Sequence, residues 1–260
     1  VEQTSPIIGE NEVVGSLSPD GRLRAHWSES ENGKSITVRD AASGDIHSVW
    51  PTDGSLKPLN FTWSPDGTRL AVVIRSDTHV GLECWEVSSE RRISRWLHRR
   101  FHASDRKFTV PTWSPDGDHI ATVGMGDLGD NGLSIWSSHV HVVNVASGRR
   151  TVKRQFGNRP RYGGRIKSLS WSPDGRFLAQ GTTEGLFDII ASQTDESAVL
   201  CKAHDADVRA FAWSPNGQRL ATAAADGTVK IIEPRKGNEL LTFRVEDDGC
   251  SLVSWSPDGK

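Results

Sequence analysis

Histidines and acidic residues are the side chains in this sequence whose types and spacing could bind a metal ion. His139 and His141 would project from one face of a strand, because they are two residues apart, and His98 and His102 are four apart. A zinc site needs at least three protein ligands, and no third ligand with suitable spacing joins either pair. The oxygen-rich segment 127–132 lacks the alternating ligands and closing Glu of a calcium loop. We therefore predict no metal ion and no cofactor.

Nucleophilic catalysis would need a reactive side chain in a recognisable setting. The three cysteines, Cys84, Cys201 and Cys250, form no C-x-x-C pair and no even set, so neither a zinc site nor a disulfide framework is indicated. No G-x-S-x-G, phosphate loop or H-E-x-x-H motif occurs in the chain. The sequence therefore predicts a protein that is not an enzyme.

Charge is unevenly distributed along the 260 residues, although the net charge is only −2. Residues 91–167 carry fifteen lysines and arginines against five aspartates and glutamates. Most of these basic residues fall in two runs, 91–107 and 149–167. No stretch approaches the ~20 apolar residues of a membrane span, so we expect no membrane segment.

A short motif ending in Ser-Pro-Asp-Gly, or once Ser-Pro-Asn-Gly, recurs along the whole chain. Its six copies begin at Leu17, Trp63, Trp113, Trp171, Trp213 and Trp255. They are 42 to 58 residues apart, and a period of ~40 to 50 residues is typical of a four-stranded propeller blade. The internal repeat therefore has to be interpreted before any local motif.

Each copy of the motif predicts a tight turn between two strands. Proline presets the first turn position, and glycine accepts the positive φ that closes the hairpin. The strand before the turn, such as 208–213, and the strand after it, such as 220–225, are nearly continuous apolar runs, which suits burial on both faces. Leu241, Phe243 and Val245 alternate with polar residues, as expected of a half-exposed outer strand.

Four strands per repeat predict an all-β fold, a β-propeller of four-stranded antiparallel blades. We expect residues 1–260 to form one incomplete propeller, with six to seven blades in the complete ring. The expected blades are five full ones and the start of a sixth: 12–56, 57–106, 107–164, 165–207, 208–250 and the partial 251–260.

The repeats resemble those of the WD-repeat β-propeller family over nearly the whole chain. That family joins a His, a Ser or Thr, an Asp and a Trp in a hydrogen-bonded tetrad within each blade. By this resemblance His204, Thr222 and Asp226 would form a structural tetrad, but Ile232 stands in the Trp place. The other repeats match this pattern less well, and repeats one to three, which lack the His, also resemble those of TolB-like periplasmic propellers, which have the same architecture.

The candidate partner-binding face lies where the basic runs meet an insertion. Repeat three carries extra residues, 124–139, ahead of its third strand, and the links between blades emerge on the same face as that turn. Loops on a rigid scaffold usually carry function. The residues we select are Arg99, Arg100, Arg106, Lys107, Trp136, Arg159, Arg161 and Arg165. Paired arginines suit an acidic or phosphorylated protein partner.

The function predicted from these features is a non-catalytic scaffold for protein–protein interactions, within a larger and bacterial signalling polypeptide. The alternatives are a TolB-like periplasmic propeller and a small-ligand or substrate-gating propeller of an enzyme. We expect no nucleic acid partner, because the chain carries no recognised nucleic-acid motif. We expect a cytoplasmic protein, with the periplasm as the alternative compartment, and the sequence does not indicate an oligomeric state.

Overall fold

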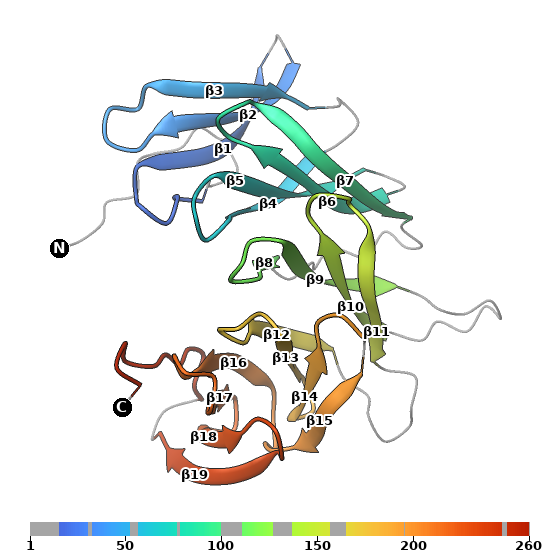
Figure 1. Ribbon diagram of the computed structural model, residues 1–260, viewed down its shortest axis with the longest axis vertical. Helices are drawn as coiled ribbons and strands as arrows, with labels where there is room; N and C mark the ends of the chain where they lie inside the picture. The colour runs from blue at the N-terminus through green and yellow to red at the C-terminus, as the bar shows by residue number, and fades with distance from the viewer. Residues whose placement is uncertain are drawn as a thin grey trace. The chain divides into compact units, whose positions relative to one another are not determined.

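The regular structure of this protein consists of β-strands (Figure 1), which confirms the predicted all-β fold class. The computed structural model describes residues 16–30, 33–52, 57–76, 79–99, 111–126, 137–156, 165–194, 196–245 and 249–259. Within these ranges no helix is long and apolar enough to cross a membrane.

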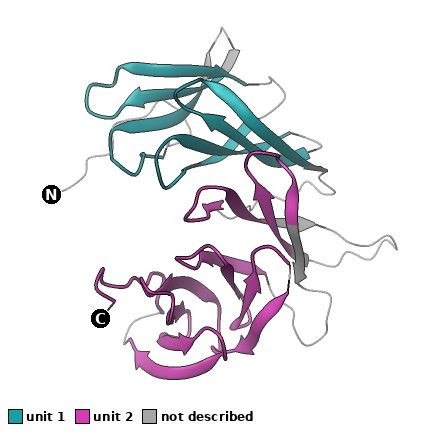
Figure 2. Ribbon diagram, in the orientation of Figure 1, with its two compact units in different colours: residues 1–100 teal, residues 101–260 magenta. Residues whose placement is uncertain are grey.

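The chain divides into two compact units, residues 1–100 and 101–260 (Figure 2), and each is described by itself. Unit 1 contains two antiparallel sheets. Sheet 1 has the order β1 (Leu23–Ser30), β2 (Gly33–Asp40) and β3 (Ile46–Pro51), and a single bridge joins Leu17 to Arg24 of β1. Sheet 2 has the order β4 (Lys57–Trp63), β5 (Arg69–Arg75), β6 (His79–Glu86) and β7 (Arg91–Arg99).

Unit 2 contains three sheets, and each is a four-stranded antiparallel meander. Sheet 3 consists of β8 (Thr112–Trp113), β9 (His119–Gly126), β10 (Ser137–Asn144) and β11 (Arg150–Phe156). Sheet 4 consists of β12 (Ile166–Trp171), β13 (Phe177–Thr182), β14 (Leu186–Ala191) and β15 (Ser197–Lys202). Sheet 5 consists of β16 (Val208–Trp213), β17 (Leu220–Ala224), β18 (Thr228–Glu233) and β19 (Asn238–Arg244).

The repeated turn joins the first and second strands of a sheet, and its serine and aspartate hold it closed. In sheet 4 the Ser172 hydroxyl donates to Asp174 at 2.6 Å and accepts the N–H of Phe177 at 3.0 Å. Asp174 also accepts the N–H of Arg176, and Gly175 has the predicted positive φ of 69°. The motif therefore supplies its own hydrogen-bond partners for a turn that has to reverse the chain within a few residues.

The tryptophan of the motif links its sheet to the preceding one. In unit 2 the indole N–H of Trp171 donates to the carbonyl of Thr112, Trp213 to that of Ser170, and Trp255 to that of Ala212, at 3.1, 3.2 and 2.8 Å. Trp63 does the same to Ser16 in unit 1, at 2.9 Å. The indole ring therefore packs in the core, and its N–H forms a directional hydrogen bond between neighbouring repeats.

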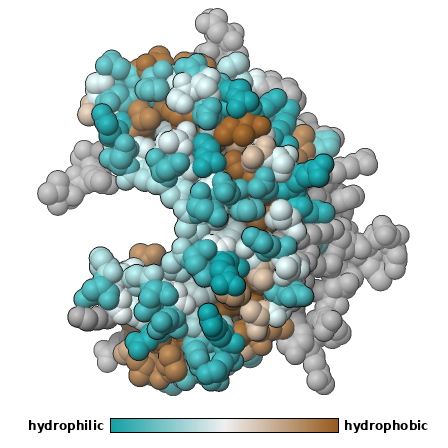
Figure 3. All heavy atoms as spheres, viewed as in Figure 1, coloured by the Kyte–Doolittle hydropathy of each residue, from teal (hydrophilic) through white to brown (hydrophobic). Residues whose placement is uncertain are grey.

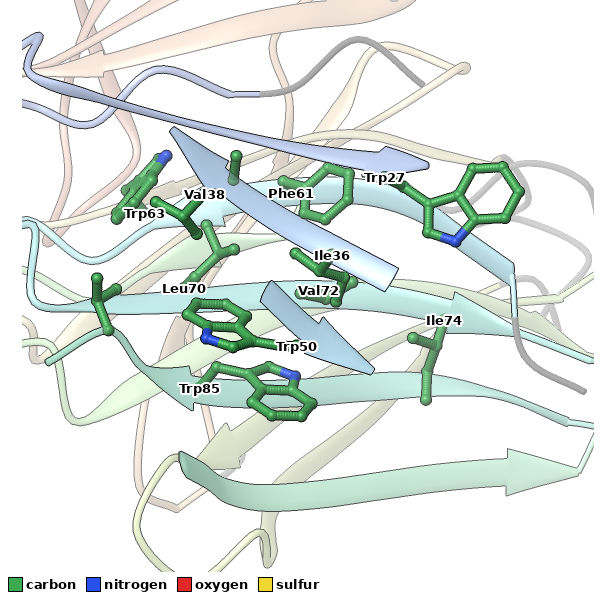
Figure 4. Close-up of a cluster of buried hydrophobic side chains, with 12 residues drawn as sticks. Trp27, Ile36, Val38, Trp50, Phe61, Trp63, Leu70, Val72, Ile74 and Trp85 are labelled. Atoms are coloured by element: carbon green, nitrogen blue, oxygen red, sulfur yellow. The ribbon is translucent and has the colours of Figure 1, made fainter. Parts of the chain in front are cut away.

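The core of unit 1 gathers aromatic and branched side chains from both of its sheets (Figure 4). Trp50 of β3 and Trp85 of β6 stack with ring centroids 5.2 Å apart and planes within 4°. The second strand β5 is buried along its length, as the apolar run predicts. Sheets 1 and 2 therefore pack against each other through an interface filled by these side chains.

Most sheets also bury polar side chains at one register position, where the sequence pattern indicated apolar strands. His26 of β1 lies opposite Thr37 of β2, Thr122 of β9 lies opposite His141 of β10, and Gln180 of β13 lies opposite Asp188 of β14, and all six are buried. In sheet 5 the buried Thr222 lies opposite Lys230, which is partly exposed. In sheet 2 the third-strand position holds Glu83, which is 3% exposed and paired with Arg92 and Arg95 at 2.9 and 3.1 Å. Partners on the adjacent strands offset the cost of burying the carboxylates of Glu83 and Asp188, since Asp188 accepts from Gln180 at 3.1 Å and from Ser197 at 2.5 Å. The buried Thr122 hydroxyl has no hydrogen-bond partner among the described residues.

The outer strand of sheet 5 differs from its prediction. Every residue of β19 is exposed, and Leu240, Leu241 and Phe243 are about half accessible to solvent. Figure 3 shows apolar side chains gathered over this strand. The alternation predicted a half-exposed strand, but no strand among the described residues packs against β19 from outside the sheet.

Candidate functional site

Most of the predicted basic face falls outside the described residues. Those positions are Arg100, Arg106, Lys107, Trp136, Arg159 and Arg161. Arg99 is the last residue of β7, and Arg165 is exposed directly before β12. The backbone N–H of Arg165 donates to the Thr183 hydroxyl at 3.0 Å, so this link lies beside the turn between β13 and β14. The basic face as a binding site stays a prediction.

The three tetrad-like residues of sheet 5 lie together. His204, on the link before β16, places Nε2 2.7 Å from the Thr222 hydroxyl. Its Nδ1 lies 3.2 Å from an Asp226 carboxylate oxygen and 2.9 Å from the Thr228 hydroxyl. A neutral ring protonated on Nδ1 satisfies every contact, because it donates on one side and accepts the Thr222 hydroxyl on the other. Ile232, in the place of the family's Trp, is buried and joins the apolar core of this sheet.

The electrostatics of this cluster favour a neutral imidazole beside an ionised carboxylate. Burial lowers the pKa of His204, and the attraction of Asp226 offsets this only in part. Burial acts to raise the pKa of Asp226, but hydrogen bonds from Thr228 and from the N–H of Asp205 outweigh it, so the pKa is lowered. Because both ring nitrogens of His204 form hydrogen bonds, this cluster holds the link before β16 against sheet 5.

A pH-dependent stability follows from the lowered pKa of His204. The unfolded chain binds a proton at this position near its ordinary pKa of about 6.5, whereas the folded chain binds it only at lower pH. The free energy of unfolding should therefore fall as pH is lowered through about 6.5 toward 5. Urea unfolding at several pH values should show a smaller fall for His204→Gln, which should also be less stable at neutral pH by about 1–3 kcal/mol.

The control for this experiment is Gln218→Ala. Gln218 is exposed and carries no titratable group, so its replacement should leave the pH dependence of the parent unchanged. Equal pH dependence in the parent and in His204→Gln would contradict the assigned role of His204.

A groove of about 800 Å³ runs between sheets 4 and 5, which both belong to unit 2. Its apolar surface includes Phe177, Ile189, Ala198 and Trp213. Three turns form its rim: 172–174 and 215–218, which are two neighbouring copies of the repeated motif, and 233–235 between β18 and β19. We call this depression the seam groove. No pattern in the sequence indicated it, because its residues come from seven separate stretches of chain.

Two of the described cysteines, Cys84 and Cys201, are poorly suited to nucleophilic chemistry. Burial raises the pKa of Cys84 to about 12 and that of Cys201 to about 11, so both remain thiols at neutral pH. Among the described residues no three His, Cys, Asp or Glu side chains converge as a metal site would require.

Consecutive four-stranded antiparallel meanders, each with the repeated turn between its first two strands and an indole bond to a neighbour, define the blades of a β-propeller. The family described as anaphase-promoting complex subunit 4 WD40 domain matches residues 112–205 and 197–258, which is more than half of the chain. The chain belongs to this WD40 family, and the predicted resemblance to WD-repeat propellers is confirmed.

Two curated relatives share parts of this sequence. One component of eukaryotic translation initiation factor 3 from Cryptococcus neoformans is 23% identical over 131 residues, covering 46% of this chain and 17% of that protein. Dipeptidyl-peptidase 5 of Porphyromonas gingivalis is 25% identical over 177 residues, covering 59% of this chain and 24% of that protein. The chain thus spans a quarter or less of the length of these relatives.

A solved structure shares the fold. The computationally designed Ika8 protein aligns with a TM-score of 0.63 at 13% identity, over 94% of this chain and 64% of that protein. At this identity the likeness shows the architecture alone.

Proposed function

We propose that this propeller is a non-catalytic scaffold that binds protein partners. Membership of the WD40 family carries the proposal, because these domains generally mediate protein–protein interactions. The environment of the described reactive side chains supports it. The thiols of Cys84 and Cys201 have raised pKa values, and His204 is held on both sides by hydrogen bonds within its own sheet.

The finer parts of the proposal concern the partner and the setting. We infer that the basic face binds an acidic or phosphorylated protein, in the cytoplasm, as part of a larger signalling polypeptide of bacterial origin. The support is the excess of arginine and lysine in residues 91–167, since arginine can form paired hydrogen bonds with a carboxylate or a phosphate.

The experiment that tests this role is capture of partners by the complete polypeptide after nuclease treatment. The variant reverses four charges, at Arg99, Arg100, Arg159 and Arg161, to Glu. The matched control reverses four exposed cations elsewhere, at Arg22, Lys57, Arg219 and Arg244. Mass spectrometry should find a defined protein retained by the parent and by the control, and reduced about tenfold or more with the variant.

Thermal unfolding of each protein shows whether the fold has survived. If the parent and the folded variant retain the same proteins in the same amounts, the basic face is not the binding surface.

A second candidate function follows from the peptidase relative. A propeller can govern access of substrate to a catalytic domain, and the 25% identity to dipeptidyl-peptidase 5 favours this alternative, with the periplasm as its compartment. Release of dipeptides by the complete polypeptide, and its loss on removal of residues 1–260, would establish this function in place of the scaffold.

A further inference from the structure

The seam between sheets 4 and 5 is closed less completely than the other described seams. The core of unit 1 has twelve buried members and one that is partly buried, and the core between sheets 3 and 4 has eight and one. The core between sheets 4 and 5 has five buried members and six that are partly buried. Phe177 and Trp213 are among those six and also line the seam groove. Apolar surface is therefore accessible inside this groove.

Relative to unit 1, the seam between sheets 4 and 5 has smaller residues at two register positions. In unit 1, Trp50 on the outer strand of the first sheet stacks on Trp85 of the next sheet. The residues at the same register in sheets 4 and 5 are Cys201, opposite Phe187, and Ile232, opposite Leu220. Neither side chain has the volume of an indole, so at these two positions the seam between sheets 4 and 5 contains less side-chain volume than the core of unit 1.

The motif turn that sheet 5 contributes to the rim carries one negative charge fewer than the other copies of the motif. Five of the six motif copies carry Asp at the third position after the aromatic or leucine residue, and only the copy in sheet 5 carries Asn. Asn216 keeps the turn bonds, since its side-chain oxygen accepts from the Ser214 hydroxyl at 2.8 Å and from the N–H of Gln218 at 3.0 Å. Its amide group then offers N–H donors where the other turns present a second carboxylate oxygen.

The same rim carries a cation that is available to a ligand. Arg235 is exposed at the groove, and no ion pair among the described residues involves it. The neighbouring Lys236, by contrast, is held by Glu233 at 2.9 Å. The rim of sheet 5 therefore combines a guanidinium with the amide donors of Asn216 and Gln218, and its own carboxylate, Glu233, is paired with Lys236. This set of donors suits a carboxylate of a ligand, and Asp174 on the rim of sheet 4 is the other acidic residue of the lining.

We propose that the seam groove binds an extended peptide segment of a partner protein, with a large apolar side chain packed between Phe177 and Trp213 and an adjacent Asp or Glu bound by Arg235. The inference deepens the proposed scaffold function by assigning it a second docking site, in sheets 4 and 5. The apolar anchor supplies buried area, and the acidic residue fixes the orientation of the peptide.

Selection from a phage-displayed library of random short peptides on the complete chain tests this assignment. Enriched peptides should pair an aromatic or large aliphatic residue with a neighbouring Asp or Glu. Ala198→Trp should abolish their binding by filling the groove, and Arg235→Glu should weaken it by about tenfold or more. Both positions are exposed, so both variants should fold.

The matched control is Arg244→Glu, which makes the same charge change on β19 outside the groove and should leave peptide binding unchanged. The variant with four reversed charges on the basic face should also bind the peptides as the parent does. Peptide binding by the groove and partner capture by the basic face are thus tested separately, and either can be contradicted while the other holds. The proposal is overturned if no peptide is enriched over the Ala198→Trp protein, or if the enriched peptides lack an acidic residue.

Discussion

Replacing Gly185 with alanine is expected to cost about 4 kcal/mol of the free energy of unfolding. Gly185 has a φ of 76° in the turn between β13 and β14. A Cβ there would lie 1.9 Å from the carbonyl oxygen of His204, which is backbone and cannot rotate away. The Gly185 carbonyl also accepts the N–H groups of Ala203 and His204, both at 3.1 Å, so any shift would break the bonds that hold this link.

The matched control is Gly175→Ala in the same sheet. Gly175 has a similar φ of 69°, but an added Cβ would meet its nearest atoms at an ordinary 3.7 Å. Only the left-handed backbone conformation is then penalised, by about 1–2 kcal/mol. Urea unfolding of both variants separates the two contributions. Equal losses would mean that the link before β16 does not press against this turn.

Replacing Trp171 with alanine is expected to cost about 3–5 kcal/mol. Trp171 is buried in the core between sheets 3 and 4, and its indole N–H donates to the Thr112 carbonyl at 3.1 Å. Truncation removes the ring volume and leaves a carbonyl without its donor. Trp171→Phe keeps an aromatic ring and loses the hydrogen bond, so it should cost less, about 1–2 kcal/mol.

Chemical unfolding followed by circular dichroism measures these losses. Leu240→Ala serves as the surface control, because Leu240 is 47% exposed and its truncation should cost well under 1 kcal/mol. If Trp171→Phe is as unstable as Trp171→Ala, the directional bond matters more than the buried ring, contrary to the prediction.

Local chemistry explains why the turns and strands could be predicted from the sequence. The Ser-Pro-Asp-Gly turn depends on residues within a few positions of one another, and the strands beside it are marked by apolar runs. The cluster of His204, Thr222 and Asp226 could be placed because the family resemblance supplied its pattern, and the structure brings the three together.

Contacts between distant strands explain what the sequence did not show. Cross-strand polar pairs such as Gln180 with Asp188 become visible only once the register is known. The seam groove depends on the smaller side-chain volume of Cys201 and Ile232 relative to Trp50 and Trp85. A local sequence pattern does not show which residues meet across a seam, so this difference in volume could not be recognised from the sequence. The exposure of β19 likewise depends on what packs against it, since its own alternation is ordinary for a strand.

The bond from each motif tryptophan to the preceding sheet has an evolutionary consequence. The repeats that begin at Trp171 and Trp213 carry both halves of the joint: an indole that reaches back, and, just before that indole, a carbonyl that receives the next one. An in-frame duplication of one such repeat would therefore produce a copy that has both the indole donor and the carbonyl acceptor needed to bind its two neighbours. A gene of this kind can gain whole repeats by unequal recombination, and the new copy needs no compensating substitutions before it can dock.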